Sequence, residues 1–150
     1  MSRSSVGKAV HAAGLDQLDA RTLYGLLRLR VDVFVVEQSC PYPELDGRDG
    51  EPGARHWWVD EGEGPVCYLR VLVEPDGSGR IGRVATRPEA RGRGLAAQLV
   101  REALAADGCP RPVHAAAQAH LEDWYARLGF GVVGPGYDED GIPHVPMMLA

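Results

Sequence analysis

The stretch RPEARGRGLAAQLV, residues 87–100, places two glycines and three arginines directly before a run of good helix formers. The N-terminus of a helix leaves backbone N–H groups unbonded and carries roughly half a positive charge from the helix dipole. Glycines at positions 92 and 94 keep Cβ atoms away from these amides, and Arg91 and Arg93 can add charge-assisted hydrogen bonds. The stretch therefore predicts a bound anion. The alternative is a solvated arginine–glycine loop whose glycines only satisfy turn geometry.

Two familiar phosphate-binding motifs do not explain this stretch. The Walker pattern ends in Gly-Lys-Ser or Gly-Lys-Thr, and the sequence contains no such ending. The Rossmann fingerprint places its glycines beside the first strand, whereas residues 92–94 lie beyond the midpoint of the chain. The predicted anion site therefore belongs to another kind of phosphate loop.

Length and charge limit the class of protein. The chain has 150 residues, 45% of them hydrophobic, which predicts a single compact domain over residues 1–150. The net charge of -5 argues against a nucleic-acid partner, because such a protein needs a basic surface, but it leaves a discrete anion such as a nucleotide open. No segment reaches the roughly 18 apolar residues that span a bilayer, and the N-terminus lacks a signal-peptide pattern. We therefore expect a cytoplasmic protein with no membrane partner.

The cysteines, histidines and acidic residues do not form a metal-binding pattern. Cys40, Cys67 and Cys109 are an odd set without a CxxC pair, which indicates neither a disulfide framework nor a zinc site. The histidines lack HExxH spacing, and residues 46–49 place an arginine where a calcium loop needs an oxygen ligand. We therefore expect no metal.

The first half of the sequence predicts a strand, a helix and an antiparallel meander. Residues 6–13 can form the strand, and Asp19 is a candidate N-cap for a helix that ends within residues 35–38. A long loop rich in proline, glycine and aspartate follows. Three β-like stretches then come at residues 54–61, 65–75 and 80–88, separated by turn signals.

The second half alternates helices and strands. Apolar spacing predicts a helix from Leu95 that Gly108 terminates, and a second helix over residues 121–128. A short buried strand at residues 112–118 lies between them. Two final strands fall within residues 130–135 and 144–150, and Asp140-Gly141 indicates a turn in the segment that joins them.

These features resemble the GNAT family, the GCN5-related N-acetyltransferases. The pyrophosphate loop of that family follows the pattern Gln/Arg-x-x-Gly-x-Gly/Ala, which residues 91–96 match in full. VATRP precedes the loop and WYARLGF follows it, as in that family, and the order of elements agrees over essentially the whole chain. A narrower resemblance to the ElaA-type branch lies in LLRLRVDVFVVEQSCPYPELDG, AAQAHLEDWYARLGF and YDEDGIPHVPMM.

The resemblance implies both a fold and a cosubstrate. The expected fold is α/β (α+β), with a mixed, mostly antiparallel sheet of six to seven strands flanked by helices. Two central strands splay apart to hold acyl-CoA. Acetyl-CoA would place its pyrophosphate on the amides around residues 92–96 and its pantetheine arm along the strand before them. The cofactor-binding residues implied in this way are Val84, Ala85, Thr86, Arg91, Gly92, Arg93, Gly94, Leu95 and Ala96.

The implied reaction is direct transfer of an acetyl group to an amine in a ternary complex. A backbone amide within residues 84–86 would stabilise the oxyanion of the tetrahedral intermediate. Tyr125 occupies the family position of the general acid that protonates the leaving thiolate. The alternative for Tyr125 is an ordinary core residue, because it lies on the same apolar helix face as Leu121 and Leu128.

The acceptor amine needs help to lose its proton. A lysine-like amine with a pKa of about 10.4 costs roughly 4 to 5 kcal/mol to neutralise at pH 7. The candidate bases are Glu37, His56, Glu139 and His144, which all lie near expected element ends. We expect Glu37 and His144 to act as a pair that binds or deprotonates the amine. The alternative for each is an ordinary polar residue of the surface or core.

We expect the acceptor to be the amine of a small molecule or of a peptide. Acidic stretches at residues 44–51 and 138–140 could attract a cationic acceptor, although acidic loops are more often only solvated. The C-terminal strands are a candidate surface for a homodimer. Three further functions stay open: a sensor that binds acetyl-CoA without catalysis, a covalent route through a cysteine, and a plain interaction domain.

Overall fold

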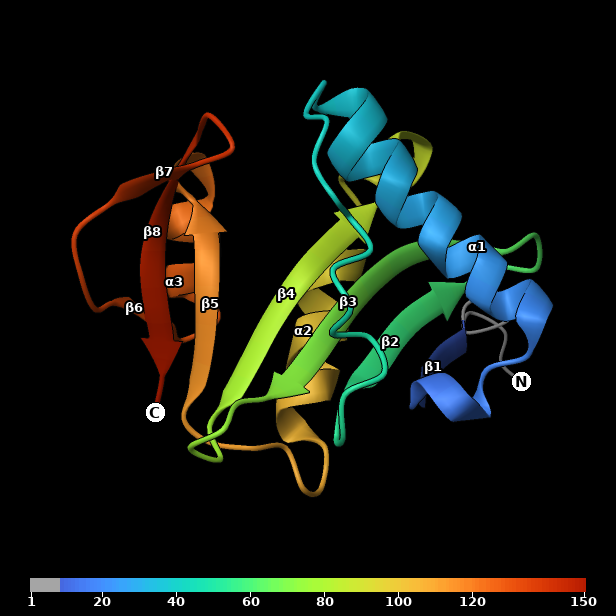
Figure 1. The fold of residues 1–150 in the computed structure, drawn as a ribbon, viewed down its shortest axis with the longest axis horizontal. Helices are drawn as coiled ribbons and strands as arrows, with labels where there is room; N and C mark the ends of the chain where they lie inside the picture. The colour runs from blue at the N-terminus through green and yellow to red at the C-terminus, as the bar shows by residue number, and fades with distance from the viewer. Residues whose placement is uncertain (1–8) are drawn as a thin grey trace.

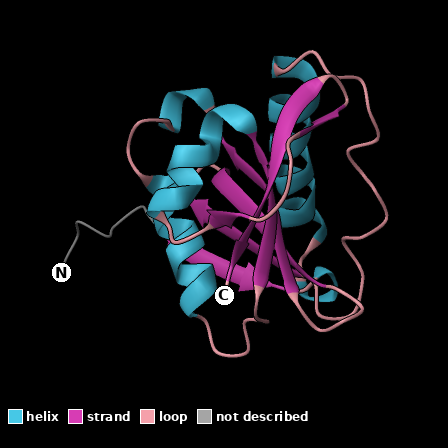
Figure 2. Ribbon diagram, turned by 90° about the vertical axis from the view of Figure 1, so that its left-hand side faces the viewer, coloured by secondary structure: helices cyan, strands magenta, loops and turns pink. Residues whose placement is uncertain are grey.

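The computed structural model describes residues 9–150, which form one twisted sheet with helices on both faces (Figures 1 and 2). The strands run in the spatial order β1-β2-β3-β4-β5-β8-β6, and β7 pairs with β8. The pairing of β4 with β5 is parallel, and the other pairs are antiparallel. The strands are β1 Ala9–Ala13, β2 Arg55–Asp60, β3 Pro65–Val73, β4 Gly79–Thr86, β5 Val113–Gln118, β6 Gly131–Val132, β7 Tyr137–Glu139 and β8 Ile142–Leu149.

This architecture confirms the expected mixed, mostly antiparallel sheet, with one strand more than the six to seven foreseen. The additional strand is β7, in a segment that the sequence indicated as a connection. Asp140-Gly141 forms the predicted turn with positive φ at both residues, and it folds β7 back onto β8 as a hairpin. All three residues of β7 are exposed and polar or aromatic, so the sequence shows no apolar alternation that would predict this strand. Residues 6–8 of the predicted first strand lie outside the described residues, while β1 begins at Ala9.

Helices α1 (Ala20–Val31) and α2 (Leu95–Ala105) cover opposite faces of the sheet, as Figure 2 shows. The alternation of side chains along β3 supplies both faces. Cys67, Leu69 and Val71 lie in one buried cluster with Leu99 of α2. Tyr68 points to the other face, into the cluster formed with α1. The third helix, α3 (Glu122–Arg127), contributes Tyr125 to the first cluster.

The first helix extends to the expected end in a changed form. The Asp19 side chain caps it by accepting a hydrogen bond from the Thr22 amide at 2.7 Å. After Val31 the backbone continues as a π-helical segment, η2 (Asp32–Glu37). Such segments shift the side chains of one face and are frequent at functional sites. Here the segment carries Phe34 and Glu37 to the place where the central strands separate.

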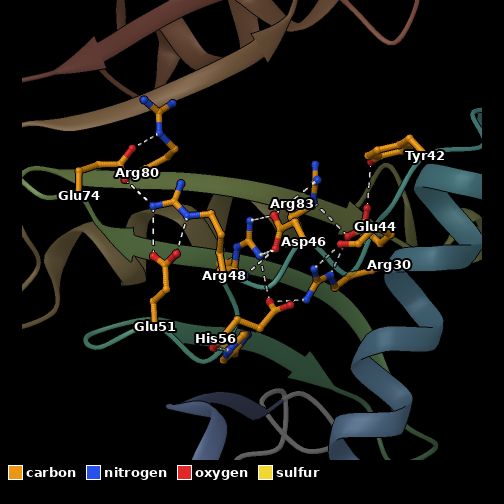
Figure 3. A network of polar contacts seen from close by, with 12 residues as sticks. Arg30, Tyr42, Glu44, Asp46, Arg48, Glu51, His56, Glu74, Arg80 and Arg83 are labelled. Atoms are coloured by element: carbon orange, nitrogen blue, oxygen red, sulfur yellow. Dashed lines mark hydrogen bonds and ion pairs between the residues drawn. The ribbon is translucent and has the colours of Figure 1, made fainter.

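The long loop after η2 is held against the sheet by a network of arginines and carboxylates (Figure 3). Arg30 of α1 donates to Glu44 at 2.8 Å and to Asp49 at 2.7 Å, and Arg70 of β3 donates to Asp46 at 2.9 Å. The carboxylates within residues 44–51 are therefore paired with arginines of the same chain. This pairing removes most of the free negative charge with which the loop could have attracted a cationic acceptor.

The two central strands splay apart as expected. β4 and β5 pair only from Gly79 to Ile81, and beyond Ile81 the β5-facing edge of β4 has no strand partner among the described residues. β5 continues instead along β8 as far as Gln118. Figure 1 shows the resulting gap widening from the bottom of the view to the top. The site described next lies at this divergence.

Candidate active site

Two cavities open where β4 and β5 diverge, and they share a wall. The larger has a volume of about 560 Å³ and extends from the divergence to the N-terminus of α2. The smaller, of about 300 Å³, extends from the divergence to the long loop and the β7–β8 hairpin. The residues common to both are Phe34, Gln38, Val84, Gln118, Leu121 and Tyr125.

The larger cavity contains the stretch that predicted an anion site. Every cofactor-binding residue implied by the resemblance lines it, except Arg93. Gly94 is the N-cap of α2, and no side chain caps the first amides of the helix. Gly92 and Gly94 have φ of +78° and +74°, and a Cβ at either position would find no atom within 4 Å. The loop therefore presents uncovered amides to the cavity, as an anion site requires.

The two arginines of this loop are paired with carboxylates on the surface. Arg91 donates from both Nη atoms to Glu37 at 2.6 Å, and both side chains are 41% exposed. These hydrogen bonds lower the pKa of Glu37 and raise the pKa of Arg91. Arg93 pairs with Glu61 and does not line the larger cavity. Only Arg91 is thus placed to reach an anion in the cavity directly.

Tyr125 has structural features of both roles between which the sequence left a choice. It is 6% exposed and makes edge-on contacts with Trp124 and Phe130, as a core residue does. It also lines both cavities, and its hydroxyl forms no hydrogen bond with the described residues. Burial raises the pKa of Tyr125 to about 12, so the hydroxyl keeps its proton at neutral pH. The position suits a proton donor.

His144 lies in the wall of the smaller cavity with one ring nitrogen occupied. Its Nδ1 lies 2.7 Å from the Ile142 carbonyl oxygen, which can only accept, so Nδ1 carries a proton. In the neutral ring Nε2 then keeps its lone pair and can accept a proton. The ring stacks on Tyr137 of β7, and Glu139 of the same strand lines the same cavity.

The structure does not bring the two expected basic residues together. Glu37 lines only the larger cavity, in its ion pair with Arg91, whereas His144 lines only the smaller one. His56 lines neither, because its two ring nitrogens contact the Tyr68 hydroxyl at 2.6 Å and the Asp49 carbonyl at 3.1 Å. Burial lowers the pKa of His56, as expected for a neutral interior histidine.

Sequence reasoning missed Arg83, which lies in a bulge of β4. Between the pairs Tyr68–Ala85 and Arg70–Gly82, β4 contains one residue more than β3. Arg83 has φ of +53°, a left-handed conformation that is uncommon for a residue with a side chain. A glycine inside a strand is a bulge signal, so Gly82 could have indicated the irregularity. The bulge places Arg83 and Val84 in the wall of the smaller cavity.

The cysteines contribute one residue to the site. Cys40 lines the smaller cavity, and its thiol donates to the Asp140 carbonyl at 3.6 Å. Burial raises the pKa of Cys67 and of Cys109, which makes both poor nucleophiles. No group of residues within 9–150 is arranged to hold a metal ion. In the same part of the chain, every helix is too short or too polar to cross a bilayer.

Comparison with known proteins agrees with this geometry. A UPF0039 protein of Mycobacterium tuberculosis (strain ATCC 25618 / H37Rv) is 48% identical over 145 residues, which cover 94% of this chain and 92% of that protein. The crystal structure of Escherichia coli ElaA superposes with a TM-score of 0.89 at 36% identity, over 95% of this chain and 99% of that chain. An acyl-CoA N-acyltransferase from Pseudomonas aeruginosa gives a TM-score of 0.87 at 40% identity, over the same shares of the two chains.

These similarities confirm the expected likeness to the ElaA-type branch. The family model of the acetyltransferase (GNAT) domain matches residues 29–150. These residues include the phosphate loop and the wall that the two cavities share. The chain therefore belongs to the GNAT acetyltransferase family.

Proposed function

We propose that this protein is an N-acyltransferase that moves an acetyl group from acetyl-CoA directly to an amine in a ternary complex. The larger cavity takes the acyl-CoA and the smaller cavity takes the amine. The observation that carries this proposal is the shared wall: two cavities of different lining meet at Val84 and Tyr125. A direct transfer requires such a meeting point, because the amine nitrogen must reach the thioester carbon without an enzyme-bound intermediate.

The lining of the larger cavity suits the parts of CoA. Its pyrophosphate fits the amides at the start of α2, where the helix dipole adds a favourable potential. Arg91 can exchange Glu37 for a phosphate, because exposed ion pairs contribute at most about 1 kcal/mol. The pantetheine arm fits the edge of β4 at Val84 to Thr86, which lacks a strand partner on the β5 side. Glu37 in this scheme positions Arg91, since its lowered pKa makes it a weak base.

The chemistry divides among three groups at the junction. His144 Nε2 accepts a proton from the ammonium, and the resulting amine attacks the thioester carbon. A backbone amide of residues 84–86 donates to the oxyanion that forms. When the C–S bond breaks, the Tyr125 hydroxyl gives its proton to the thiolate, and the tyrosinate takes back the extra proton that the new amide nitrogen still carries. His144 releases its proton to solvent, and the products are the acetylated amine and CoA. The raised pKa of Tyr125 keeps this proton in place until the thiolate develops.

A catalytically silent sensor of acetyl-CoA would need the larger cavity alone. The second cavity, with His144 and Tyr125 facing it, favours the enzyme. Two measurements test the proposal in sequence. Calorimetric titration with acetyl-CoA and with CoA should show micromolar binding of both. Release of free thiol from acetyl-CoA should then depend on an added amine; saturating binding without thiol release for any class of amine contradicts the enzyme and supports the sensor.

A further inference from the structure

Four arginines line the smaller cavity, and their guanidinium groups differ in how fully they are used. Those of Arg48 and Arg70 donate to carboxylates of the long loop and of Glu74, directly after β3, at distances between 2.6 and 3.2 Å. Arg80 uses only its Nε, which donates to Glu74 at 2.6 Å. Arg83 forms no hydrogen bond at all with the residues that the structure describes.

Arg83 is nevertheless held firmly. Its Nε lies 3.1 Å from a carboxylate oxygen of Glu44, and one of its Nη atoms lies 3.9 Å from a carboxylate oxygen of Asp46, in both cases without a hydrogen bond. The buried Nε has no hydrogen-bond partner. The guanidinium carbon lies 5.7 Å from the ring centre of Phe34 and 5.4 Å from that of Tyr42. Arg83 is thus held by two aromatic faces and two nearby carboxylates, but none of its N–H groups donates a hydrogen bond to the described residues. Its guanidinium can still take a planar acceptor.

The direction of this side chain fits a ligand in the cavity. Figure 3 shows Arg30 and Arg48 directed into the carboxylate network, whereas the end of Arg83 rises away from it, and so does that of Arg80. Both Arg80 and Arg83 come from β4 and line the smaller cavity. The bulge explains why Arg83 lies in the cavity wall, because it gives this residue its left-handed backbone.

The opposite wall of the same cavity has the complementary character. Glu139 of β7 lines it and forms no ion pair in the described part of the chain. His144 of β8 is the group we assign to take the proton of the amine. The cavity thus combines a cationic wall on β4 with an anionic and basic wall on the hairpin. Its volume of about 300 Å³ lies at the lower end for small-molecule sites.

We propose that Arg83 binds a carboxylate of the acceptor, so that the acceptor is a small amine of the amino-acid type. This inference rests on the proposed function, because it places the amine between His144 and the shared wall. A carboxylate matches the guanidinium fork in two parallel hydrogen bonds. Arg80 adds positive charge to the same wall, and one carboxylate supplies the acceptor atoms that Arg83 lacks in the protein.

The test compares acceptors that differ only in this group. An equimolar mixture of the common α-amino acids and a matched mixture of their primary carboxamides are incubated with the protein and acetyl-CoA, and the acetylated products are measured by mass spectrometry. We expect at least one acid to be acetylated about tenfold or more faster than its amide, as hydrogen bonds to charged groups allow. Arg83→Gln should reduce this ratio to about one, whereas Arg87→Gln, directly after β4 and outside both cavities, should preserve it.

A binding readout separates this inference from the proposed function. The α-N-acetyl amino acids and their amides are titrated into the CoA-saturated protein and into Arg83→Gln. Acid-selective binding that the substitution abolishes supports the carboxylate site, even if no amine is acetylated and the enzyme proposal fails. Equal or faster acetylation of the amides by the wild type overturns the inference while leaving the acyltransferase intact. An acid preference that Arg83→Gln leaves unchanged also overturns it.

Discussion

Arginine–carboxylate pairs occur in two regions of this molecule, and they serve different ends. In the network beneath the long loop, Arg30 and Glu44 have side chains 1% and 2% exposed. At the phosphate loop, Arg91 and Glu37 are each 41% exposed and sit at the rim of a cavity. The chemical groups and the bond lengths are similar. What differs is access to water, and this decides whether a pair can be exchanged for a ligand.

A buried pair cannot exchange its partner cheaply. Removing one member leaves the other charged and desolvated, which costs about 3 to 5 kcal/mol. An exposed pair contributes about 0 to 1 kcal/mol, so a phosphate can replace its carboxylate at little cost. We therefore attribute stability to the first region and propose anion binding for the second.

The largest expected effect on stability comes from the buried region. Arg30→Met should lower the free energy of unfolding by about 3 to 5 kcal/mol, because it leaves Glu44 and Asp49 without their closest cation. Urea unfolding measures the change. The matched control is Arg28→Met, two residues earlier in the same helix. The side chains of its pair with Asp32 are 70% and 61% exposed, so the substitution should change stability by at most about 0.5 kcal/mol. Similar losses for the two variants would break the comparison.

At the phosphate loop, a change should abolish binding with a smaller loss of stability. Gly94→Val forces a branched side chain into a left-handed conformation and covers the first amides of α2. We expect affinity for CoA to fall more than about hundredfold, as loss of several charge-assisted hydrogen bonds implies. The matched control is Gly108→Val, beyond the other end of α2. It imposes a similar backbone penalty, because φ of Gly108 is +81° and no atom lies within 4 Å of a Cβ placed there. Wild-type affinity in Gly94→Val would refute the loop assignment.

The pH dependence of stability should contain two steps that report on the buried region. Because burial lowers the pKa of His56 in the folded state, the unfolded chain takes up a proton first as pH falls below about 6.5. The free energy of unfolding should then decrease until pH reaches the folded pKa. A second decrease should follow below about pH 4, because hydrogen bonds from arginines overcome burial and lower the pKa of Asp49. His56→Gln should remove the upper step, and replacing the exposed His120 should not.

The smallest effect should come from the exposed pair itself. Glu37→Gln frees Arg91 from a charged partner, so we expect affinity for CoA to rise by a few-fold, with thermal stability almost unchanged. Titration calorimetry measures the gain, which should shrink as salt is added. If the substitution instead abolished turnover while leaving CoA affinity unchanged, Glu37 would be the base that the sequence suggested, and its role as a positioning residue would be wrong.

Much of the fold could be predicted from the sequence because its signals are local. Apolar spacing and caps located α2 and the helix after Asp19, and turn residues located the meander. The phosphate loop was visible because glycines and arginines must be adjacent in sequence to form it. The strand β7 was not, since three exposed residues owe their pairing to the turn that follows them.

The acceptor side of the site was harder to predict because it is assembled from distant segments. Arg83 enters the cavity only through a bulge, which depends on the register between β3 and β4. The role of Glu37 changes with the position of Arg91, which lies 54 residues further along the chain. His56 and His144 look alike in sequence, and only burial and hydrogen-bond partners distinguish an interior histidine from one that faces a cavity.

The most direct test of the account is the turnover of Tyr125→Phe at saturating acetyl-CoA, measured beside its affinity for CoA. The substitution removes one hydroxyl from the junction of the two cavities and keeps the ring that packs against Phe130. We expect the rate of thiol release to fall about hundredfold or more, as loss of a general acid implies, with CoA affinity unchanged. An unchanged rate would remove Tyr125 from the reaction and contradict transfer at the shared wall.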